Sequence, residues 1–393
     1  MVKFAHIADV HLGGWKQQPL QEMNLQSFRK AIDTCLEEKV EFVLMAGDIF
    51  DSAFPPIDIL KETFAEFRRL KEAGIPCFII AGSHDYSVSG KTFLDVLEKA
   101  GFCKNVADFE EREEKIILNP TIHEGVAIYG YPGKTSGMEV NDLRKVRFNE
   151  TPGLFKIFML HTTIDKAAGN LPIDALETSK VPFADYYAMG HLHIDFQYEN
   201  FVYPGPIFPN NFQELEDLSH GRFCIIDTEA ESESQMKRIK LKIRDVVPFT
   251  IEIKNAHLAT QHIISELEKK DLEDKIVLLR LKGVMESGKN SDINYNQIEE
   301  ATKRKKAYFL LRNTHDLKQK EIEIDETVDF NSEKNSETLE IETIKSYSEQ
   351  NPSEFNATIS ELMGALSTEK QEGETSESFT SRLLDETQKI LKF

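Results

Sequence analysis

Apolar residues in the first 230 positions fall into short continuous runs that are separated by stretches with helical spacing. Six runs are typical of buried strands, at residues 2–8, 40–46, 75–81, 126–131, 154–160 and 186–190. Between them, apolar residues at steps of three and four predict helices, first around residues 25–36 and then over residues 57–72. Strands that alternate with helices predict an α/β layer architecture for residues 1–230.

The pattern changes near residue 230. Residues 236–244 alternate like a half-exposed strand with a basic face, and two helix-to-strand passages follow before residue 312. We therefore expect a second, small α+β domain over residues 231–312. Residues 313–350 are dense in Glu, Ser, Asn and Thr, which predicts an acidic flexible linker.

Helical periodicity returns in residues 351–393. One apolar stripe is formed by Phe355, Ile359, Leu362, Met363 and Leu366, and a second by Phe379, Leu383, Leu384, Ile390 and Leu391. Plausible helix starts stand at Asn351-Pro352 and Thr375-Ser376. Two short amphipathic helices cannot bury their apolar faces alone, so we expect this tail to dock on a partner.

Composition fits a soluble globular protein of two or three domains, with 393 residues, 40% hydrophobic and 29% charged. No apolar run approaches the ~20 residues that cross a bilayer, and the first residues lack the pattern of a secretory signal. The cysteines are widely spaced without a CxxC pair. We therefore expect no disulfide framework, no thiolate zinc site and no membrane association, and a cytoplasmic location.

The formal net charge of −20 opposes nucleic-acid binding, although its distribution is uneven. Residues 313–393 carry 8 of the 47 basic and 19 of the 67 acidic side chains. DNA would have to be held by a local patch or by metal ions. Residues 303–306 and 236–244 are the basic clusters of note; a solvated face is the commoner role for such a cluster, and a DNA-backbone patch is the functional alternative.

Five short segments place Asp and His side chains where a predicted strand ends. They are Asp9-Val10-His11, Gly47-Asp48-Ile49-Phe50, Gly82-Ser83-His84-Asp85, His161 and Gly190-His191-Leu192-His193. Ligands of open α/β sheets collect at the carboxyl ends of strands. Carboxylate and imidazole ligands together suit Mn²⁺ or Fe²⁺, and a carboxylate can bridge two ions roughly 3.5–4 Å apart. A single buried histidine is more often a hydrogen-bonded core residue, but five such segments in order predict a metal centre.

The order of these motifs resembles the calcineurin-like metallophosphoesterase superfamily. Within it, the segments ADVHLG, GDIFDSAFPP, YYAMGHLH and YPGPIF are similar to the meiotic recombination eleven nucleases, which repair DNA double-strand breaks. The superfamily resemblance covers about residues 1–230, and the rest resembles the family's capping domain and partner-binding helices more loosely. It implies a two-sheet sandwich flanked by helices, a small α+β capping domain and a C-terminal helical tail.

The resemblance also implies a centre of two Mn²⁺ ions, with Fe²⁺ or Mg²⁺ as alternatives. Its ligands would be Asp9, His11 and His193 for the first ion, His161 and His191 for the second, and Asp48 as the bridge. His84 would contact the scissile phosphate and protonate the leaving oxygen, and Asp85 would orient the His84 imidazole.

Two positions depart from the family pattern. Ser83 stands where relatives have an Asn ligand, and its hydroxyl is a poorer ligand, so we expect a weak second site. Asp51 stands where many relatives have His, which removes a possible phosphate contact and adds a negative charge near the groove.

The function implied by the resemblance is a manganese-dependent DNA nuclease that acts on DNA ends with a coiled-coil ABC-type ATPase docked on residues 351–393. A homodimer through helix 57–72 and a helix after Ser89 is also implied, although both apolar faces could simply cover the sheet. One alternative is a phosphoesterase for cyclic nucleotides, nucleotide sugars or phosphoproteins. Another is a weakly active scaffold, because of Ser83.

Overall fold

The computed structural model describes residues 2–87, 90, 92–134, 136–169, 173–231, 235–319, 358–366, 368 and 376–391. The chain divides into two compact units. The first comprises Met1–Gly283 with Ser287–Leu317, and the second comprises Val284–Glu286 with Lys318–Phe393.

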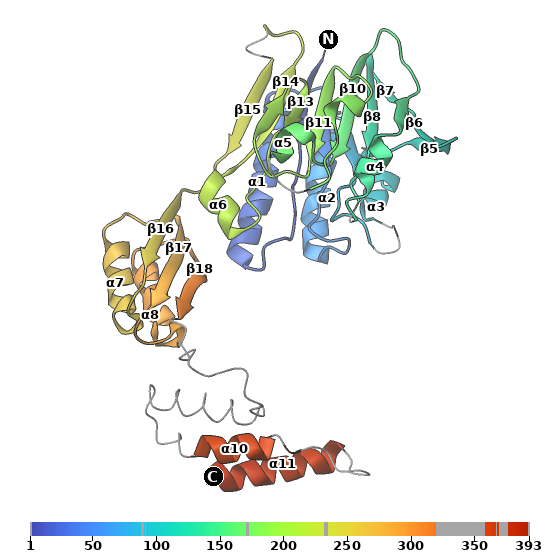
Figure 1. The fold of residues 1–393 in the computed structure, drawn as a ribbon. Coiled ribbons are helices and arrows are strands. Elements are labelled where there is room, and N and C mark those ends of the chain that lie inside the picture. The colour runs from blue at the N-terminus through green and yellow to red at the C-terminus, as the bar shows by residue number, and fades with distance from the viewer. Residues whose placement is uncertain are drawn as a thin grey trace. The chain divides into compact units, whose positions relative to one another are not determined.

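Two six-stranded sheets form the centre of the first unit (Figure 1). The first has the order β15 (Met236–Leu241), β14 (Gly221–Asp227), β1 (Lys3–Ile7), β2 (Phe42–Ala46), β3 (Cys77–Ile80) and β4 (Lys104–Asn105). Strands β1 to β4 are parallel, and β14 and β15 are added antiparallel.

The second sheet has the order β12 (Phe196–Tyr198), β13 (Phe201–Tyr203), β11 (Tyr186–Gly190), β10 (Phe155–His161), β8 (Val126–Tyr131) and β7 (Thr121–His123). Its four central strands are parallel, and its two edge strands are antiparallel to their neighbours. The carboxyl ends of β10 and β11 therefore reach the same edge.

Three apolar clusters show how the layers pack. In one, α1 (Gln18–Glu37), α2 (Ile57–Glu72) and α3 (Leu94–Lys99) cover the outer face of the first sheet. In the next, the two sheets face each other through residues such as Phe42 and Met159. In the last, α4 (Glu139–Leu143) and a small sheet cover the outer face of the second sheet. The fold is thus a two-sheet sandwich flanked by helices, as predicted.

Shorter elements complete this part of the chain. The small sheet has the order β5 (Phe109–Arg112), β6 (Lys115–Leu118) and β9 (Val146–Phe148). The connections also contain α5 (Asp165–Ala168), the 3-10 turn Thr178–Lys180 and α6 (Phe212–Leu218). The apolar pattern did not predict this small sheet, because its strands are only three or four residues long and Phe109–Arg112 is exposed throughout.

A small α+β domain follows β15. Its parallel pair β16 (Val246–Glu252) and β17 (Ile276–Met285) is joined by β18 (Phe309–Gln319), with α7 (Ala256–Glu268), the 3-10 turn Asn290–Asp292 and α8 (Tyr295–Arg304). An apolar cluster that includes Trp15, Leu20, Ile276 and Leu278 joins this domain to the start of α1. Trp15 is thus a packing residue.

The six predicted strands and the helix at 57–72 are confirmed. The helix expected after Ser89 is α3, and its Leu97 packs on the core with Phe67 and Leu70 of α2. Strand β18 continues to Gln319, into the predicted linker; the linker's residues 320–350 lie outside the described residues.

In the second unit, α10 (Ile359–Leu366) contacts α11 (Ser376–Leu391), in agreement with two tail helices. The predicted helix start at Asn351-Pro352 lies outside the described residues. Among the described helices, none is long and apolar enough to cross a membrane.

Candidate metal centre

The five predicted segments come together where strands of both sheets end. Strands β1 and β2 run parallel, and two main-chain hydrogen bonds join the loops that follow them. The N–H of Asp9 donates to the carbonyl of Gly47 at 3.3 Å, and the N–H of His11 donates to the carbonyl of Asp48 at 2.9 Å. These main-chain hydrogen bonds hold the two loops next to each other without any side-chain contact.

Four of the predicted ligands have left-handed backbone conformations. The φ angles are 51° for Asp9, 45° for His11, 49° for Asp48 and 90° for His191. Residues other than glycine rarely adopt such angles, and strained backbone of this kind clusters at functional sites. Here the left-handed residues interrupt the extended backbone after each strand. Asp9 and His11, two positions apart, can therefore both contribute to one cluster.

Among the residues that the structure describes, three sets of side chains have ligand atoms within 4.8 Å of one another, close enough to hold a metal ion. They are Asp9, His11 and His193; His11, Asp48 and His84; and Asp9, Asp48 and His161. The first set matches the ligands predicted for the first ion. Asp9, His11 and Asp48 each belong to two of the sets, so the bridging role of Asp48 stays a prediction.

His161 is held by the main chain of the neighbouring sheet. Its Nδ1 lies 2.9 Å from the carbonyl oxygen of Ala46, so Nδ1 donates and Nε2 is the atom that could bind a metal ion. Nε2 is 3.1 Å from Asp48 Oδ2 yet makes no hydrogen bond of good geometry within the described residues. A Cβ at Gly47 or Gly190 would collide with this arrangement, which explains the glycine that precedes Asp48 and His191 in the two motifs.

Two further histidine rings face each other. His11 Nδ1 is 3.1 Å from Asp51 Oδ1, and His193 Nδ1 is 2.9 Å from Glu214 Oε1. Ionised carboxylates only accept hydrogen bonds, so both Nδ1 atoms donate. The two Nε2 atoms are 3.1 Å apart and share a hydrogen bond, so one of them carries a proton in the metal-free protein, and both point to the place that a metal ion could take from that proton.

The buried charges at this place require a counter-ion. Burial raises the pKa of Asp9, and its Oδ2 has no hydrogen-bond partner among the described residues. Burial would also raise the pKa of Asp48, but the charge of His161 and its contact hold that pKa well below its usual range. Burial lowers the pKa of His161, and Asp48 more than reverses this, to about 10. In the metal-free protein, the positive charge of protonated His161 thus compensates the negative charge of Asp48, as a bound metal ion would.

An unsatisfied buried carboxylate oxygen and three oriented imidazoles fit divalent metal ions. Ser83 also lies at the centre, with its Oγ 3.4 Å from Asp48 Oδ2. His191 donates its main-chain N–H to Asp9 Oδ1 at 2.8 Å, and its ring centroid is 5.2 Å from that of His161. His191 is in none of the three ligand sets, so its role at the second ion stays a prediction.

His84 stands at the mouth of the centre, with 48% of its side chain exposed. Its main-chain N–H donates to Asp48 Oδ1 at 2.8 Å, and its Nδ1 lies 2.9 Å from the carbonyl oxygen of Asp51. Nδ1 therefore donates, and Nε2 is free to face a substrate.

Asp85 differs from the expectation that it orients the His84 ring. Its carboxylate accepts from the main-chain N–H groups of Ile49, Phe50 and Gly82, at 3.3, 3.0 and 2.9 Å. Burial and the charge of Asp48 raise its pKa to about 6. Asp85 thus joins the loops after β2 and β3, and Asp51 provides the partner of the His84 ring.

Glu214 and the contact made by Asp51 were not predicted. The signal for Glu214 was present, since Asn211 and Glu214 have the spacing of a helix capping box, and Asn211 does accept from the Glu214 N–H. That pattern predicts a helix start, but it does not predict that Glu214 contacts His193, which lies 21 residues earlier in the chain.

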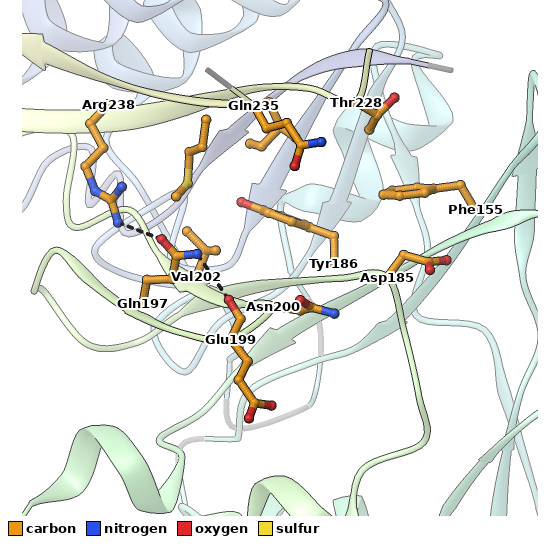
Figure 2. Close-up of a pocket in the computed structure, with 12 residues that line it drawn as sticks. Phe155, Asp185, Tyr186, Gln197, Glu199, Asn200, Val202, Thr228, Gln235 and Arg238 are labelled. Carbon is orange, nitrogen blue, oxygen red and sulfur yellow. Dashed lines mark hydrogen bonds between the residues drawn. The ribbon is translucent and has the colours of Figure 1, made fainter. Parts of the chain in front are cut away.

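A cavity of about 420 Å³ lies elsewhere, at the opposite ends of the strands (Figure 2). Its lining includes Phe155 and Tyr186, the first residues of β10 and β11, whereas His161 ends β10. None of the predicted metal ligands lines it, so it is not the metal centre.

Residues 2–195 match the family model of calcineurin-like phosphoesterases. This segment carries every predicted metal ligand, and this part of the chain belongs to the calcineurin-like metallophosphoesterases. This segment is therefore of a phosphoesterase hydrolase family, and its cluster of His and Asp side chains could hold metal ions.

Particular relatives extend the likeness. The DNA double-strand break repair protein Mre11 of Archaeoglobus fulgidus is 27% identical over 372 residues, covering 86% of this chain and 80% of its own. The uncharacterized metallophosphoesterase YhaO of Bacillus subtilis is 28% identical over 292 residues, 68% of each chain. The Mre11 protein of Sulfolobus acidocaldarius is 26% identical over 297 residues, 72% of this chain and 74% of its own. The chain is thus distantly similar to Mre11 proteins.

Proposed function

We propose that this protein is a manganese-dependent DNA nuclease that processes DNA ends in double-strand-break repair, together with a coiled-coil ABC-type ATPase. The observation that supports this most is the extent of one likeness. Similarity to the Archaeoglobus fulgidus repair protein covers 86% of the chain, whereas the phosphoesterase family segment ends at residue 195. A relative that shares only the catalytic fold would not be similar over the small domain.

The side chains of the centre have separable tasks in this proposal. Asp9, His11 and His193 would hold one ion, His161 and His191 would hold the other, and Asp48 would contribute to both. Two bound ions would lower the pKa of a water molecule and neutralise charge on the phosphate. His84 has its Nδ1–H committed to a carbonyl, so protonated Nε2 can give its proton to the leaving oxygen.

Part of the positive charge of the basic clusters is paired with carboxylates and is less available to DNA. Lys303 and Lys306 pair with Glu299 and Glu273, at 2.7 and 3.0 Å. On β15, Arg238 pairs with Asp195 at 2.6 Å. We therefore expect phosphate binding to depend on the metal centre more than on a basic patch, with a shallow dependence of affinity on salt.

A phosphoesterase for smaller phosphodiesters is the second candidate, favoured by the likeness to YhaO over 68% of the chain. One assay separates the two. The purified protein is incubated with Mn²⁺ and linear duplex DNA, single-stranded DNA or bis-p-nitrophenyl phosphate, with EDTA and Asp48→Ala as controls. We expect cleavage of DNA that needs Mn²⁺ and Asp48. Hydrolysis of the small diester with intact DNA would contradict the nuclease proposal and support the second candidate.

The partners form part of the same proposal. Residues 351–393, with α10 and α11, would dock the ATPase, and two chains would form a homodimer near α2 and α3. Phe67 and Leu70 of α2 are buried on the sheet, so a dimer would use residues that remain exposed, such as Phe54, Ile57 and Val96. Light scattering at micromolar concentration should give twice the mass of one chain; the mass of a single chain would exclude the dimer.

A further inference from the structure

Two carboxylates behind the metal centre face the rear nitrogens of two predicted ligands. Asp51 Oδ1 is 3.1 Å from His11 Nδ1, and Glu214 Oε1 is 2.9 Å from His193 Nδ1. We propose that Asp51 and Glu214 are positioning residues, which fix both rings so that their Nε2 atoms converge on the first metal ion. This inference concerns the metal centre and does not depend on DNA being the substrate.

The two carboxylates are tied to each other through Asn210. Its side-chain Nδ2 donates to Asp51 Oδ1 at 3.3 Å, and its main-chain N–H donates to Glu214 Oε2 at 2.7 Å. A Cβ at Gly14 would collide with Asn210 Oδ1 and crowd Asp51 Oδ1. The second glycine of the Gly13-Gly14 pair thus makes room for this connection.

The loop that carries Asn210 is itself anchored. The indole N–H of Trp15 donates to the carbonyl of Pro209 at 2.9 Å, and Trp15 is buried. Asn211 caps α6, and its side chain accepts from the N–H of Glu214 at 2.9 Å. Glu214 therefore has little freedom to turn away from His193.

Asp51 has a second contact that involves its main chain. Its carbonyl oxygen accepts from His84 Nδ1 at 2.9 Å, while its side chain accepts from His11. One residue thus positions a metal ligand and the predicted proton donor. His161 is held differently, by the carbonyl of Ala46. The two predicted ions therefore depend on separate supports.

Because different contacts support the ligands of the two predicted ions, the loss of one carboxylate should weaken the binding of one ion only. Carboxylates behind ligating histidines fix the tautomer and raise the basicity of the ligand nitrogen, and their loss costs roughly 10–100-fold in metal affinity. We expect Glu214→Gln and Asp51→Asn to weaken the tight, first-ion step of a Mn²⁺ titration by about tenfold or more. The weaker step should change little, because His161 keeps its partner.

The experiment is isothermal calorimetry with Mn²⁺ on the full chain, compared with Asp217→Asn as the matched control. Asp217 lies on the same helix, is exposed, and accepts from Gln213. Asp217→Asn removes one negative charge, as Glu214→Gln does, but leaves the carboxylate contact to His193 unchanged.

Thermal unfolding in EDTA shows whether the metal-free variants keep their fold. Amide substitutions are nearly isosteric, so we expect unfolding temperatures close to that of the parent. Tight-step affinity equal to that of the parent or of Asp217→Asn would overturn the proposal. Equal weakening of both steps with a lowered unfolding temperature would also overturn it, because that is the result of general destabilisation. DNA is absent from these measurements, so they are independent of the proposed nuclease activity.

Discussion

The Nε2 atoms of His11 and His193 lie 3.1 Å apart, although the two residues are 182 positions apart in the chain. Each ring donates its Nδ1–H to a carboxylate, so the two Nε2 atoms are left to share one hydrogen bond with each other. Two lone pairs at this distance repel unless a proton or a cation lies between them, and a metal ion could replace the shared proton. The relationship therefore supports the predicted position of the first metal ion more directly than any single residue.

Asp48 and His84 should fail in different ways when they are replaced. Asp48→Ala removes the predicted bridging carboxylate, which belongs to two ligand sets, so we expect loss of bound Mn²⁺ in calorimetry. His84→Ala removes the proton donor at the exposed mouth, which should lower the cleavage rate roughly 10²–10⁴-fold while Mn²⁺ stays bound. If both variants lost metal to the same degree, the separate roles would be wrong.

Ser83 should limit the second ion. Its hydroxyl lies 3.4 Å from Asp48 Oδ2, where an Asn side chain could instead offer a carbonyl-type oxygen to the metal. Ser83→Asn is expected to tighten the weak step of a Mn²⁺ titration and to raise the cleavage rate. Two steps of equal affinity in the unmodified protein would contradict this explanation, and so would a variant that titrates like the parent.

Metal affinity should rise with pH. The pKa of His161 is raised to about 10, and that of His193 is also raised, despite burial, by Glu214 and Asp9. His161 is therefore protonated at neutral pH without metal, and an incoming ion must displace that proton; Glu214 and Asp9 also favour a proton on His193. For each proton displaced, affinity should increase about tenfold per pH unit. Calorimetry between pH 6 and 8, in buffers of different ionisation enthalpy, measures both the affinity and the proton release; no dependence on pH would contradict the shifts.

The same shift makes a prediction about metal-free stability. A raised pKa means that the folded state holds the His161 proton more tightly than the unfolded state. The resulting stabilisation is complete below the unfolded pKa of about 6.5 and is lost as pH rises towards 10. The unfolding temperature in EDTA should therefore fall across this range by more than that of a His161→Gln variant. Parallel pH profiles for the two proteins would show that His161 is not the titrating group.

The tail prediction can be tested with a boundary taken from the structure. Strand β18 ends at Gln319, so a chain that ends there keeps the small domain whole, whereas an end at Arg312 would cut the strand. The shortened chain should cleave single-stranded DNA with Mn²⁺ but fail to co-purify with the ATPase. Replacing Ile359 and Leu362 with Glu in the full chain should have the same effect, and Lys389→Glu on α11 serves as a charge control. Retained association in either case would exclude the tail as the docking site.

The sequence was sufficient for the layers and for the metal motifs, because both depend on local patterns. Continuous apolar runs such as residues 126–131 predicted the central strands. The positions just after predicted strands pointed to Asp9, Asp48 and His193 as candidate ligands. Their convergence could be expected because parallel strands end at one edge.

Contacts between distant loops could not be predicted in the same way. Asp51 follows its motif closely, but only the fold brings His11 within 3.1 Å of its side chain and His84 within 2.9 Å of its carbonyl. Asp85 shows the converse, since its place beside His84 in the sequence suggested a contact, and the fold directs its carboxylate to main-chain N–H groups. Short edge strands such as β5 are exposed and leave no apolar pattern to detect.

Anomalous diffraction from Mn²⁺-soaked crystals tests the central claim most directly, since it locates each ion among named side chains. We expect a strong peak between Asp9, His11 and His193, and a weaker peak beside His161, with Asp48 in contact with both. Crystals of Asp48→Ala should lose the peaks. Manganese bound elsewhere, or an empty centre at millimolar Mn²⁺ in the unmodified protein, would contradict the account of this site as a two-metal phosphoesterase centre.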